Sequence, residues 1–285
     1  MNIESTISSL KSYWREKGCL ISEPYDIEVG AGTMVPKSFF GALGHKPYKV
    51  AYVQPSRRPA DGRYGDNPYR FYIHHQFQVI LKPPPADIQD VYLESLKSIG
   101  INYENHDMRF IEDNWESPTL GAGGVGWEVW MDGQEVTQFT YFQQVGGVQL
   151  LIPAVELTYG IERIAMYSEG KNNCLLLNWN DDVTYGDLRK KEEYELCRYG
   201  FDLADVASLT QVLDIFEKEA IRCIEEKLIT PAYEFALKCS HIFNILDARG
   251  AVSVSERAIM IKRIRSLTSK CARLYVEAEN ENSAD

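Results

Sequence analysis

Val50-Ala-Tyr-Val-Gln-Pro-Ser-Arg-Arg-Pro59 is followed directly by Ala60-Asp-Gly-Arg-Tyr-Gly-Asp-Asn-Pro-Tyr-Arg70 and by Phe71-Tyr-Ile-His-His-Gln-Phe-Gln-Val-Ile-Leu-Lys-Pro83. The first and last segments are rich in β-branched and aromatic residues, whereas the middle segment is rich in Gly, Pro, Asp and Asn. This composition predicts two antiparallel strands joined by a loop, which together form a β-hairpin.

The hairpin carries an unusual concentration of arginine. Its only acids are Asp61 and Asp66, although the chain as a whole has a formal net charge of −11. A guanidinium group can bind phosphate or carboxylate oxygens through two parallel hydrogen bonds, which lysine cannot do. Single arginines near a turn are usually a solvated surface, but four on one hairpin favour an anion site such as one for nucleotide phosphate. These are Arg57, Arg58, Arg63 and Arg70.

The composition predicts a globular protein, and we expect it to be located in the cytoplasm. The chain has 285 residues, of which 45% are hydrophobic. Its longest apolar runs, such as residues 150–155, are far shorter than the ~20 residues of a membrane span. The amino terminus lacks a basic region followed by an apolar core, so no secretory signal is expected.

Cysteine spacing and overall charge argue against a zinc site and against binding of nucleic acid by bulk charge. The six cysteines form no C-x-x-C pair and the five histidines have no zinc-type spacing, which predicts reduced thiols and no zinc site. A pI near 5.1 argues against a protein that holds nucleic acid by bulk charge. Any contact with RNA is therefore expected to be local or shared with a partner.

The amino-terminal part is predicted to be one helix followed by a sheet. Residues 5–17 carry apolar side chains at helical spacing, and Gly18 ends that helix. From residue 21 to about 167, short β-rich runs alternate with Gly and Pro turns, and Asp132-Gly133 is a strong hairpin-turn signal. These patterns predict an α+β fold with a mainly antiparallel β-sheet flanked by helices. Neither a G-x-G-x-x-G loop nor a Walker loop is present.

After residue 170 the pattern becomes helical. Apolar residues recur at helical spacing from 209 to 228, and Thr230-Pro231 resembles an N-cap followed by proline at the first helical position. A second helix would run to Gly250, and a capping box at 253–256 would open the last helix. We therefore predict two domains, a catalytic domain of residues 1–170 and an all-helical domain of residues 171–285. The acidic tail from 277 to 285 is expected to be disordered.

Two stretches carry a family resemblance. Residues 50–83 have an arginine on the first strand, a loop and a phenylalanine on the return strand, which is similar to class II motif 2. Leu157-Thr-Tyr-Gly-Ile-Glu-Arg163 is a strand running into a helix that begins with Glu-Arg, which is similar to motif 3. The chain thus resembles the class II aminoacyl-tRNA synthetases, and most closely the alpha subunits of bacterial heterotetrameric glycyl-tRNA synthetases. Residues 30–36 and 253–257 extend the resemblance over nearly the whole chain.

The resemblance implies an ATP site with Arg58 and Arg163 as catalytic residues. Arg58 would hold the α-phosphate and the substrate carboxylate, and Arg57 could exchange roles with it. Arg63 and Arg70 would approach the β- and γ-phosphates. Phe77 would stack under adenine and Arg163 would cover its other face, although an aromatic residue in a strand could instead belong to the core.

In this family an acidic residue on the strand before motif 3 supplies a Mg²⁺ ligand, and oxygen ligands suit that ion. Glu128 and Glu135 are the candidates, and the sequence does not choose between them. Glu162 is expected instead to begin the motif 3 helix and to orient Arg163.

Selecting glycine requires exclusion, because the substrate has no side chain to recognise. Glu156 would pair with the ammonium group, since a carboxylate inside the apolar strand 150–157 is costly unless paired. Trp115 would supply a wall against larger amino acids, unless it packs in the core. The candidate glycine-binding residues are Thr33, Gln76, Gln78, Trp115, Glu156 and Thr158.

The implied function is activation of glycine with ATP to glycyl-adenylate and pyrophosphate, followed by transfer to the 3′ end of tRNA(Gly). No anticodon-binding module fits beside the catalytic domain, so charging is expected to need a beta subunit. Residues 30–55 would provide the motif 1 interface of an alpha homodimer, within an assembly of two alpha and two beta subunits.

Two alternatives remain open from the sequence. A non-catalytic relative would be free to lose Arg58, Phe77 and Arg163, all of which are present. A synthetase for another small amino acid is the second, because His74-His75-Gln-Phe is similar to alanyl-tRNA synthetases. The absence of a long tRNA-binding and editing extension speaks against a complete alanyl enzyme.

The last helix is rich in basic residues. It is expected to face tRNA or an acidic patch of the beta subunit, and a solvated helical face is the default alternative. The residues are Arg257, Lys262, Arg263, Arg265, Lys270 and Arg273.

Overall fold

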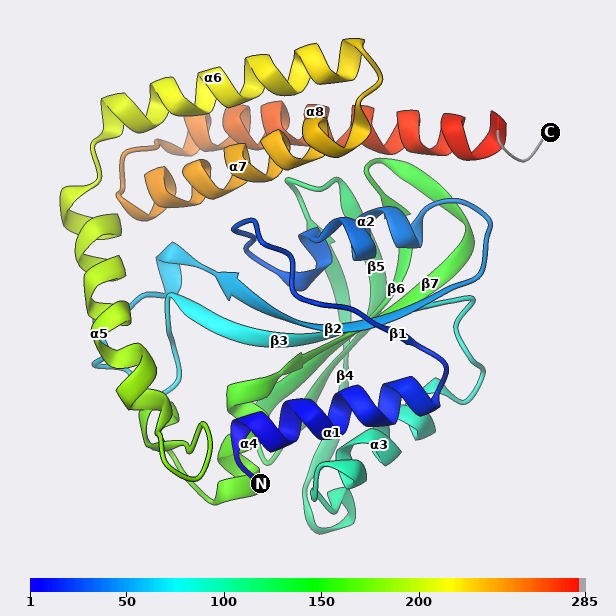
Figure 1. Ribbon diagram of the computed structural model, residues 1–285, viewed down its shortest axis with the longest axis vertical. Helices are drawn as coiled ribbons and strands as arrows, with labels where there is room; N and C mark the ends of the chain where they lie inside the picture. Colours follow the sequence, from blue (N-terminus) through cyan, green and yellow to red (C-terminus); the bar gives the residue numbers. More distant parts are fainter. Residues whose placement is uncertain (282–285) are drawn as a thin grey trace.

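The computed structural model describes residues 1–281 as a seven-stranded sheet with helices on both faces (Figure 1). The strand order is β1-β2-β3-β7-β6-β5-β4, and only β1 and β2 pair in parallel. The mainly antiparallel α+β sheet predicted from the sequence is confirmed. The strands are β1 (Leu20–Ile21), β2 (Tyr48–Arg57), β3 (Ile73–Lys82), β4 (Met108–Ser117), β5 (Ala122–Met131), β6 (Gln134–Val145) and β7 (Val148–Gly160).

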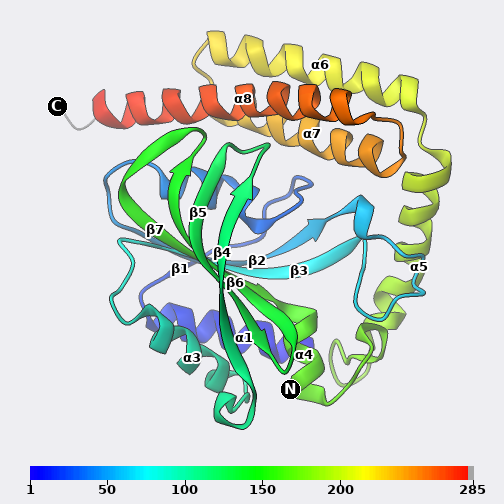
Figure 2. The same cartoon turned by 180° about the vertical axis from the view of Figure 1, so that it is seen from behind.

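Three helices cover one face of the sheet, the lower face in Figure 1: α1 (Ile3–Glu16), α3 (Ile88–Ser98) and α4 (Ile161–Glu169). The opposite face carries α2 (Pro36–Ala42), α7 (Ile229–Ala248) and α8 (Val254–Glu281), with α6 (Val206–Glu225) packed outside them (Figure 2). Helix α5 (Tyr185–Cys197) runs beside the hairpin loop between β2 and β3. No helix within residues 1–281 is long and apolar enough to cross a membrane.

The predicted hairpin is formed by β2 and β3, whose register pairs Tyr48 with Lys82 and Arg57 with Ile73. Successive side chains of a strand point to opposite faces. Ile80 belongs to the apolar cluster under α2 and α7, whereas Val79 belongs to the cluster under α1, α3 and α4. Even-numbered residues of β3 therefore face α2 and odd-numbered residues face α1.

Other local predictions from the amino-terminal part are also confirmed. Helix α1 is followed by Gly18 at φ +84°. A two-residue turn joins β5 to β6, with φ +50° at Asp132 and +85° at Gly133, the positive values that such hairpin turns require. Strand β7 runs directly into α4 at Gly160–Ile161, which is the strand-to-helix arrangement of motif 3.

The carboxy-terminal helices differ from prediction at two ends. Helix α7 begins after Leu228, so Thr230 is not its N-cap, and Pro231 lies within the first turn, where no N–H is needed. Helix α8 continues to Glu281, so the disorder expected for 277–281 is wrong, and residues 282–285 lie outside the described part of the chain. A Lys46–Glu279 ion pair of 3.2 Å helps to hold this last helical stretch.

The carboxy-terminal helices share a core with the sheet. The rings of Phe39 on α2 and Tyr233 on α7 stack with centroids 4.5 Å apart, and Tyr233 Oη donates to the Met34 carbonyl at 2.8 Å. This apolar cluster includes side chains from β2, β3, β6, β7, α7 and α8. The division at residue 170 stays a prediction, but the shared cluster fixes the segment around Met34 against the helices.

We predict that Phe39→Ala lowers the free energy of unfolding by about 3–5 kcal/mol, because it empties a buried aromatic site in this shared cluster. Leu151→Ala is the matched control, because this side chain is 84% exposed, and it should lower the free energy of unfolding by less than about 0.5 kcal/mol. Urea denaturation followed by circular dichroism measures both. Equal, small effects would show that α2 and α7 do not depend on each other.

Candidate active site

A cavity of about 410 Å³ lies on the α2 face of the sheet, across β3, β7, β6, β5 and β4. It unites residues that are far apart in the sequence, and ten predicted site residues line it. These ten are Thr33, Arg58, Arg70, Gln76, Trp115, Glu128, Glu135, Glu156, Thr158 and Arg163. The cavity is therefore the candidate active site.

Three arginines line the cavity, and two predicted ones do not. Arg58 follows β2 directly, and its Nε donates to the Gly30 carbonyl at 3.0 Å. Arg163 Nη1 donates to the Glu135 carbonyl at 2.8 Å and to its carboxylate at 3.0 Å. Arg70 comes from the hairpin loop.

Arg57 and Arg63 lie outside the cavity. Arg63 Nη1 donates to the carbonyls of Ala60 and Gly62, at 2.9 and 2.6 Å, so its guanidinium stabilises its own loop. Arg57 lies close enough to Tyr72 and His241 to act on both electrostatically. The predicted convergence of four arginines is therefore corrected to Arg58 and Arg70, with Arg163 added from α4.

Phe77 is in the core, not in the cavity. Its side chain is fully buried in the cluster under α1 and packs edge-on against Tyr159, with centroids 6.0 Å apart. The physical reason is the alternation of β3, which sends Gln76 and Gln78 to the cavity face and Phe77 to the other. Two aromatic residues of the hairpin line the cavity, Tyr69 and Phe71, and sequence reasoning missed both because they precede the strand. Phe71 is 4% exposed and also packs against the cluster under α1, so it lies at the border between the core and the cavity.

Glu156 lies in β7, between β3 and β6, with 1% of its surface exposed. Thr33 Oγ1 donates to Glu156 Oε2 at 2.8 Å, and Gln78 Nε2 donates to Oε1. Gln78 is held in turn by Thr158 Oγ1 at 2.9 Å. Burial outweighs these hydrogen bonds and raises the pKa of Glu156 to about 8. With these partners, the carboxyl group of Glu156 is mostly protonated at neutral pH.

Gln78 does not line the cavity itself but lies under its floor, fully buried. It is packed against Gly32, where an added Cβ would come within 2.5 Å of Gln78 Oε1. Gly32 N–H also donates to Gln76 Oε1 at 2.7 Å. The absence of a side chain at residue 32 therefore permits the contacts of Gln78 with Glu156.

Trp115 lies at the cavity and in the core at once, and its role as a wall against larger amino acids stays a prediction. Its ring lines the cavity and also packs against Phe142, with centroids 5.5 Å apart. Opposite it on β5, Gly124 has no room for a side chain, because a Cβ would lie 2.2 Å from the Tyr141 carbonyl oxygen.

The two candidate metal ligands face the same cavity. Glu135 pairs with Arg163, and Glu128 accepts a hydrogen bond from Trp130 Nε1 at 2.9 Å. Within residues 1–281, no group of three or more His, Cys, Asp and Glu side chains forms a metal site. Two carboxylates still fit Mg²⁺, which usually takes one or two carboxylates together with phosphate oxygens and water.

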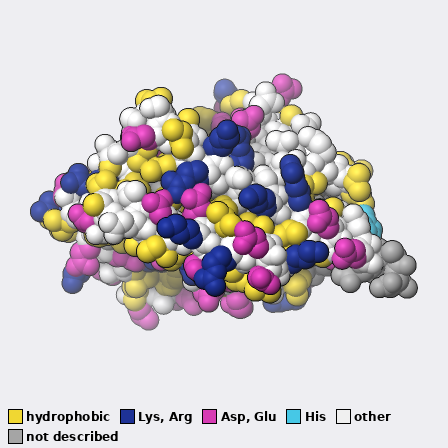
Figure 3. Space-filling model, turned by 90° about the horizontal axis from the view of Figure 1, so that it is seen from above, with side chains coloured by type: hydrophobic (Ala, Val, Ile, Leu, Met, Phe, Trp, Pro, Cys, Tyr) yellow, Lys and Arg dark blue, Asp and Glu magenta, His cyan; other side chains and the backbone are white. Residues whose placement is uncertain are grey.

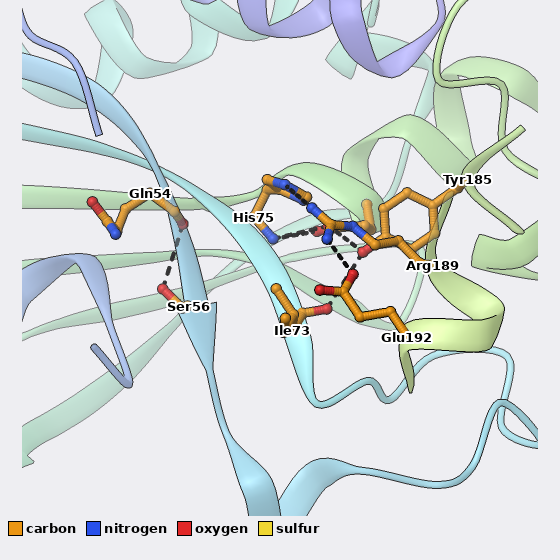
Figure 4. A network of polar contacts seen from close by, with 8 residues as sticks. Gln54, Ser56, Ile73, His75, Tyr185, Arg189 and Glu192 are labelled. Carbon is orange, nitrogen blue, oxygen red and sulfur yellow. Dashed lines mark hydrogen bonds and ion pairs between the residues drawn. The ribbon is translucent and has the colours of Figure 1, made fainter. Parts of the chain in front are cut away.

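Glu162 makes contacts beyond those expected, and its predicted orienting of Arg163 stays a prediction. It opens α4, but its carboxylate accepts from the N–H of His75, from His75 Nδ1 at 2.7 Å and from Tyr185 Oη at 2.9 Å. Burial opposes ionisation, yet the hydrogen bond and charge of His75 hold the pKa of Glu162 below its usual value. His75 Nε2 lies 3.2 Å from Arg189 Nη2 (Figure 4). Glu162 therefore links α4 by hydrogen bonds to β3 and to α5.

His74, next to this network, lines the cavity beside the arginines. Burial, with the positive charge of Arg58 added, lowers the pKa of His74 to about 3. Its imidazole is therefore neutral at physiological pH and adds no positive charge to the cavity.

The basic residues of α8 do not form one uniform surface. Arg263 is bound by Glu217 and Asp214 of α6, with nitrogen–oxygen distances of 2.5 and 2.6 Å, and Arg257 is bound by Asp247 of α7 at 3.2 Å. Figure 3 shows basic and acidic side chains interspersed on the face seen from above. Two of the six basic residues thus hold the helices together, and a role of this helix in tRNA or partner binding stays a prediction.

Comparison with known proteins decides the family. Residues 3–280 match the family described as "Glycyl-tRNA synthetase alpha subunit". The chain belongs to this family. A curated relative, the glycine–tRNA ligase alpha subunit of Coprothermobacter proteolyticus, is 55% identical over 281 residues, which are 99% of this chain and 97% of the relative.

Two solved structures of pyrrolysyl-tRNA synthetase from Desulfitobacterium hafniense are also similar, each with 12% identity and a TM-score of 0.43. They cover 65% and 64% of this chain, and 75% and 72% of theirs.

Membership of the glycyl-tRNA synthetase alpha subunit family confirms the resemblance found in the sequence. The chain is a class II aminoacyl-tRNA synthetase subunit and thus part of a ligase. The two alternatives, a non-catalytic relative and a synthetase for another small amino acid, are set aside by this assignment.

We predict that Glu156→Gln makes the folded protein less sensitive to pH. Glu156 keeps its proton up to about pH 8 when folded, whereas the ordinary value is 4.5. The folded state therefore binds more protons between these values, and wild-type stability falls as the pH rises, by up to about 1.4 kcal/mol per pH unit. The variant lacks this loss and should be the more stable protein at pH 8.

Urea denaturation of both proteins from pH 5 to pH 9 measures the difference. A stability difference that stays constant over this range would contradict a protonated Glu156.

Proposed function

We propose that this chain activates glycine with ATP, forming glycyl-adenylate and pyrophosphate in the cavity above β7. The observation that carries the proposal is the pairing of a buried carboxyl group, Glu156, with an arginine-lined cavity in one site. The ammonium group of glycine would bind at Glu156, and the triphosphate of ATP would bind at Arg58, Arg70 and Arg163. Family membership supports both substrates.

The reaction needs the glycine carboxylate held in line with the α-phosphorus of ATP. The carboxylate oxygen forms the new bond to phosphorus while the bond to pyrophosphate breaks. Both reactants are anionic, so the main tasks are positioning and neutralisation of charge. Arg58 is suited to the α-phosphate and the carboxylate, because its Nε is anchored on the Gly30 carbonyl.

Arg163 is held by Glu135 and would contact ATP from the α4 side of the cavity. In place of Phe77, we assign Phe71 as the ring that packs against adenine, since it lines the cavity beside Arg70. Glu128 and Glu135 are the residues that would hold Mg²⁺. The ion, when bound, neutralises negative charge on the phosphates.

Selection of glycine follows from the network below the cavity. Thr158 orients Gln78, and Gln78 and Thr33 orient Glu156. An ammonium group that contacts Glu156 favours the ionised carboxylate, so binding draws the glutamate from its neutral to its charged form. Trp115 then limits the room for a side chain on the substrate.

Transfer of glycine to tRNA(Gly) is proposed to require a beta subunit, as the name of the alpha-subunit family suggests. We further propose an alpha homodimer through residues 30–55, an assembly of two alpha and two beta subunits, and a cytoplasmic location. The catalytic domain is assigned to residues 1–170 and the helical domain to residues 171–285.

The direct test is amino-acid-dependent ATP–pyrophosphate exchange on the purified chain. Glycine, alanine and serine are compared, each with and without a beta subunit. We expect exchange with glycine only, and we expect Glu156→Gln to raise the KM for glycine about 30-fold or more while the KM for ATP changes little. Absence of exchange with or without the partner would refute the proposal.

We predict that Gly32→Ala raises the KM for glycine about tenfold. The added methyl group displaces Gln78, and Glu156 then loses one of its two hydrogen-bond donors. Gly123→Ala is the matched control, because a Cβ there meets nothing closer than 3.7 Å. Steady-state exchange assays at saturating ATP compare the two variants, and similar KM values for both would contradict the role given to Gln78.

A further inference from the structure

Glu193 is a buried carboxylate outside the cavity. It lies on α5, in the helical part of the chain, and only 3% of its surface is exposed. A buried carboxylate is costly unless hydrogen bonds compensate for its lost hydration. The partners of Glu193 therefore show what the residue does.

Its two oxygens accept hydrogen bonds from two distant points of the loop between β2 and β3. Glu193 Oε1 accepts from the main-chain N–H of Arg63 at 2.9 Å, and Oε2 accepts from the main-chain N–H of Tyr72 at 2.7 Å. One side chain thus spans the segment from residue 63 to residue 72.

The bridged segment is the one that supplies Tyr69, Arg70 and Phe71 to the cavity. Its end is also joined to Arg58, because the Arg58 N–H donates to the Tyr72 carbonyl at 2.7 Å. Tyr72 therefore connects Glu193 on one side with Arg58 on the other. The residue held by Glu193 thus bonds the main chain of Arg58 directly and follows Arg70 by two residues.

A neighbouring residue of α5 supports the same loop. Cys197 Sγ accepts from the Tyr64 N–H at 3.3 Å and lies 3.3 Å from Glu193 Oε1. Cys197 also packs in a small apolar cluster with Tyr72 and Ile73. Helix α5 is shown beside the loop in both ribbon views (Figures 1 and 2).

We propose that Glu193 is a positioning residue for ATP, which acts by holding the loop so that Arg58 and Arg70 face the triphosphate. The proposal rests on the proposed function, in which these arginines bind ATP. Glu193 touches no substrate. Its effect is expected in the ATP half of the site, because the hydrogen bonds of Thr33, Gln78 and Glu156 run to one another and to Thr158.

The test compares Glu193→Gln with Glu195→Gln in ATP–pyrophosphate exchange, with the beta subunit added if the wild type requires it. Glu195 is on the same helix, but its side chain is 63% exposed and forms an ion pair with Lys191 at 3.7 Å. In Glu193→Gln, an amide NH₂ faces one of the two main-chain donors. We expect its KM for ATP to rise about tenfold, with the KM for glycine within about twofold of the wild type.

Hydrogen exchange of the loop peptide 59–72 provides a readout that a general loss of stability would not produce. We expect exchange in this peptide to become faster in Glu193→Gln, with β6 and β7 unchanged. If Glu193→Gln does not fold, Glu193→Asp is used, which keeps both acceptors but shortens their reach. An unchanged KM for ATP together with unchanged exchange of the loop would overturn the proposal.

Calorimetric titration with ATP alone separates this proposal from the proposed function. A wild type that binds ATP but shows no exchange with glycine would refute the function, and the ATP affinity of Glu193→Gln would still test the positioning role. Equal loss of ATP and glycine affinity in the variant would also overturn the positioning role, because it would indicate damage to the whole site.

Discussion

The site depends on one buried carboxyl group. Glu156 occupies the middle of the sheet, where the loss of hydration makes its charged form unfavourable and raises its pKa to about 8. Only a partner with positive charge, or a proton, can satisfy it. Its two hydrogen-bond donors, Thr33 and Gln78, are uncharged, so the proposed function assigns the positive charge to the ammonium group of glycine.

The surrounding structure is arranged around this constraint. Strand β3 brings Gln78 to one side of Glu156, and the turn before α2 brings Thr33 to the other. That turn is fixed by Tyr233 of α7, which bonds the Met34 carbonyl. The arginines enter from the hairpin loop and from α4, whereas Glu156 enters from β7, and the proposed function gives the phosphates to the arginines and the amino group to Glu156. Helices from the carboxy-terminal part hold both parts, α7 through Met34 and α5 through Glu193.

Features that depend on short motifs and on strand periodicity could be predicted from the sequence. The hairpin, its arginines Arg58 and Arg70, the strand-to-helix step at Arg163 and the isolated charge of Glu156 all follow from local pattern. Phe77 was assigned to the cavity wrongly, although alternation along β3 already placed it on the face opposite Gln76 and Gln78. Arg63 was assigned to the phosphates but lies outside the cavity, because the direction of this loop side chain is set by its carbonyl partners, which the sequence does not reveal. Glu193 gave no signal, since its partners lie 130 and 121 residues away in the chain.

The most direct test of the account is the proton balance of glycine binding. Calorimetric titration of the chain with glycine at pH 7, in buffers of different ionisation enthalpy, gives the number of protons exchanged. The account predicts release of about one proton per glycine, because the ammonium group displaces the proton of Glu156. An enthalpy of binding that is the same in every buffer would contradict it, since Glu156 would then be charged already or would not contact glycine.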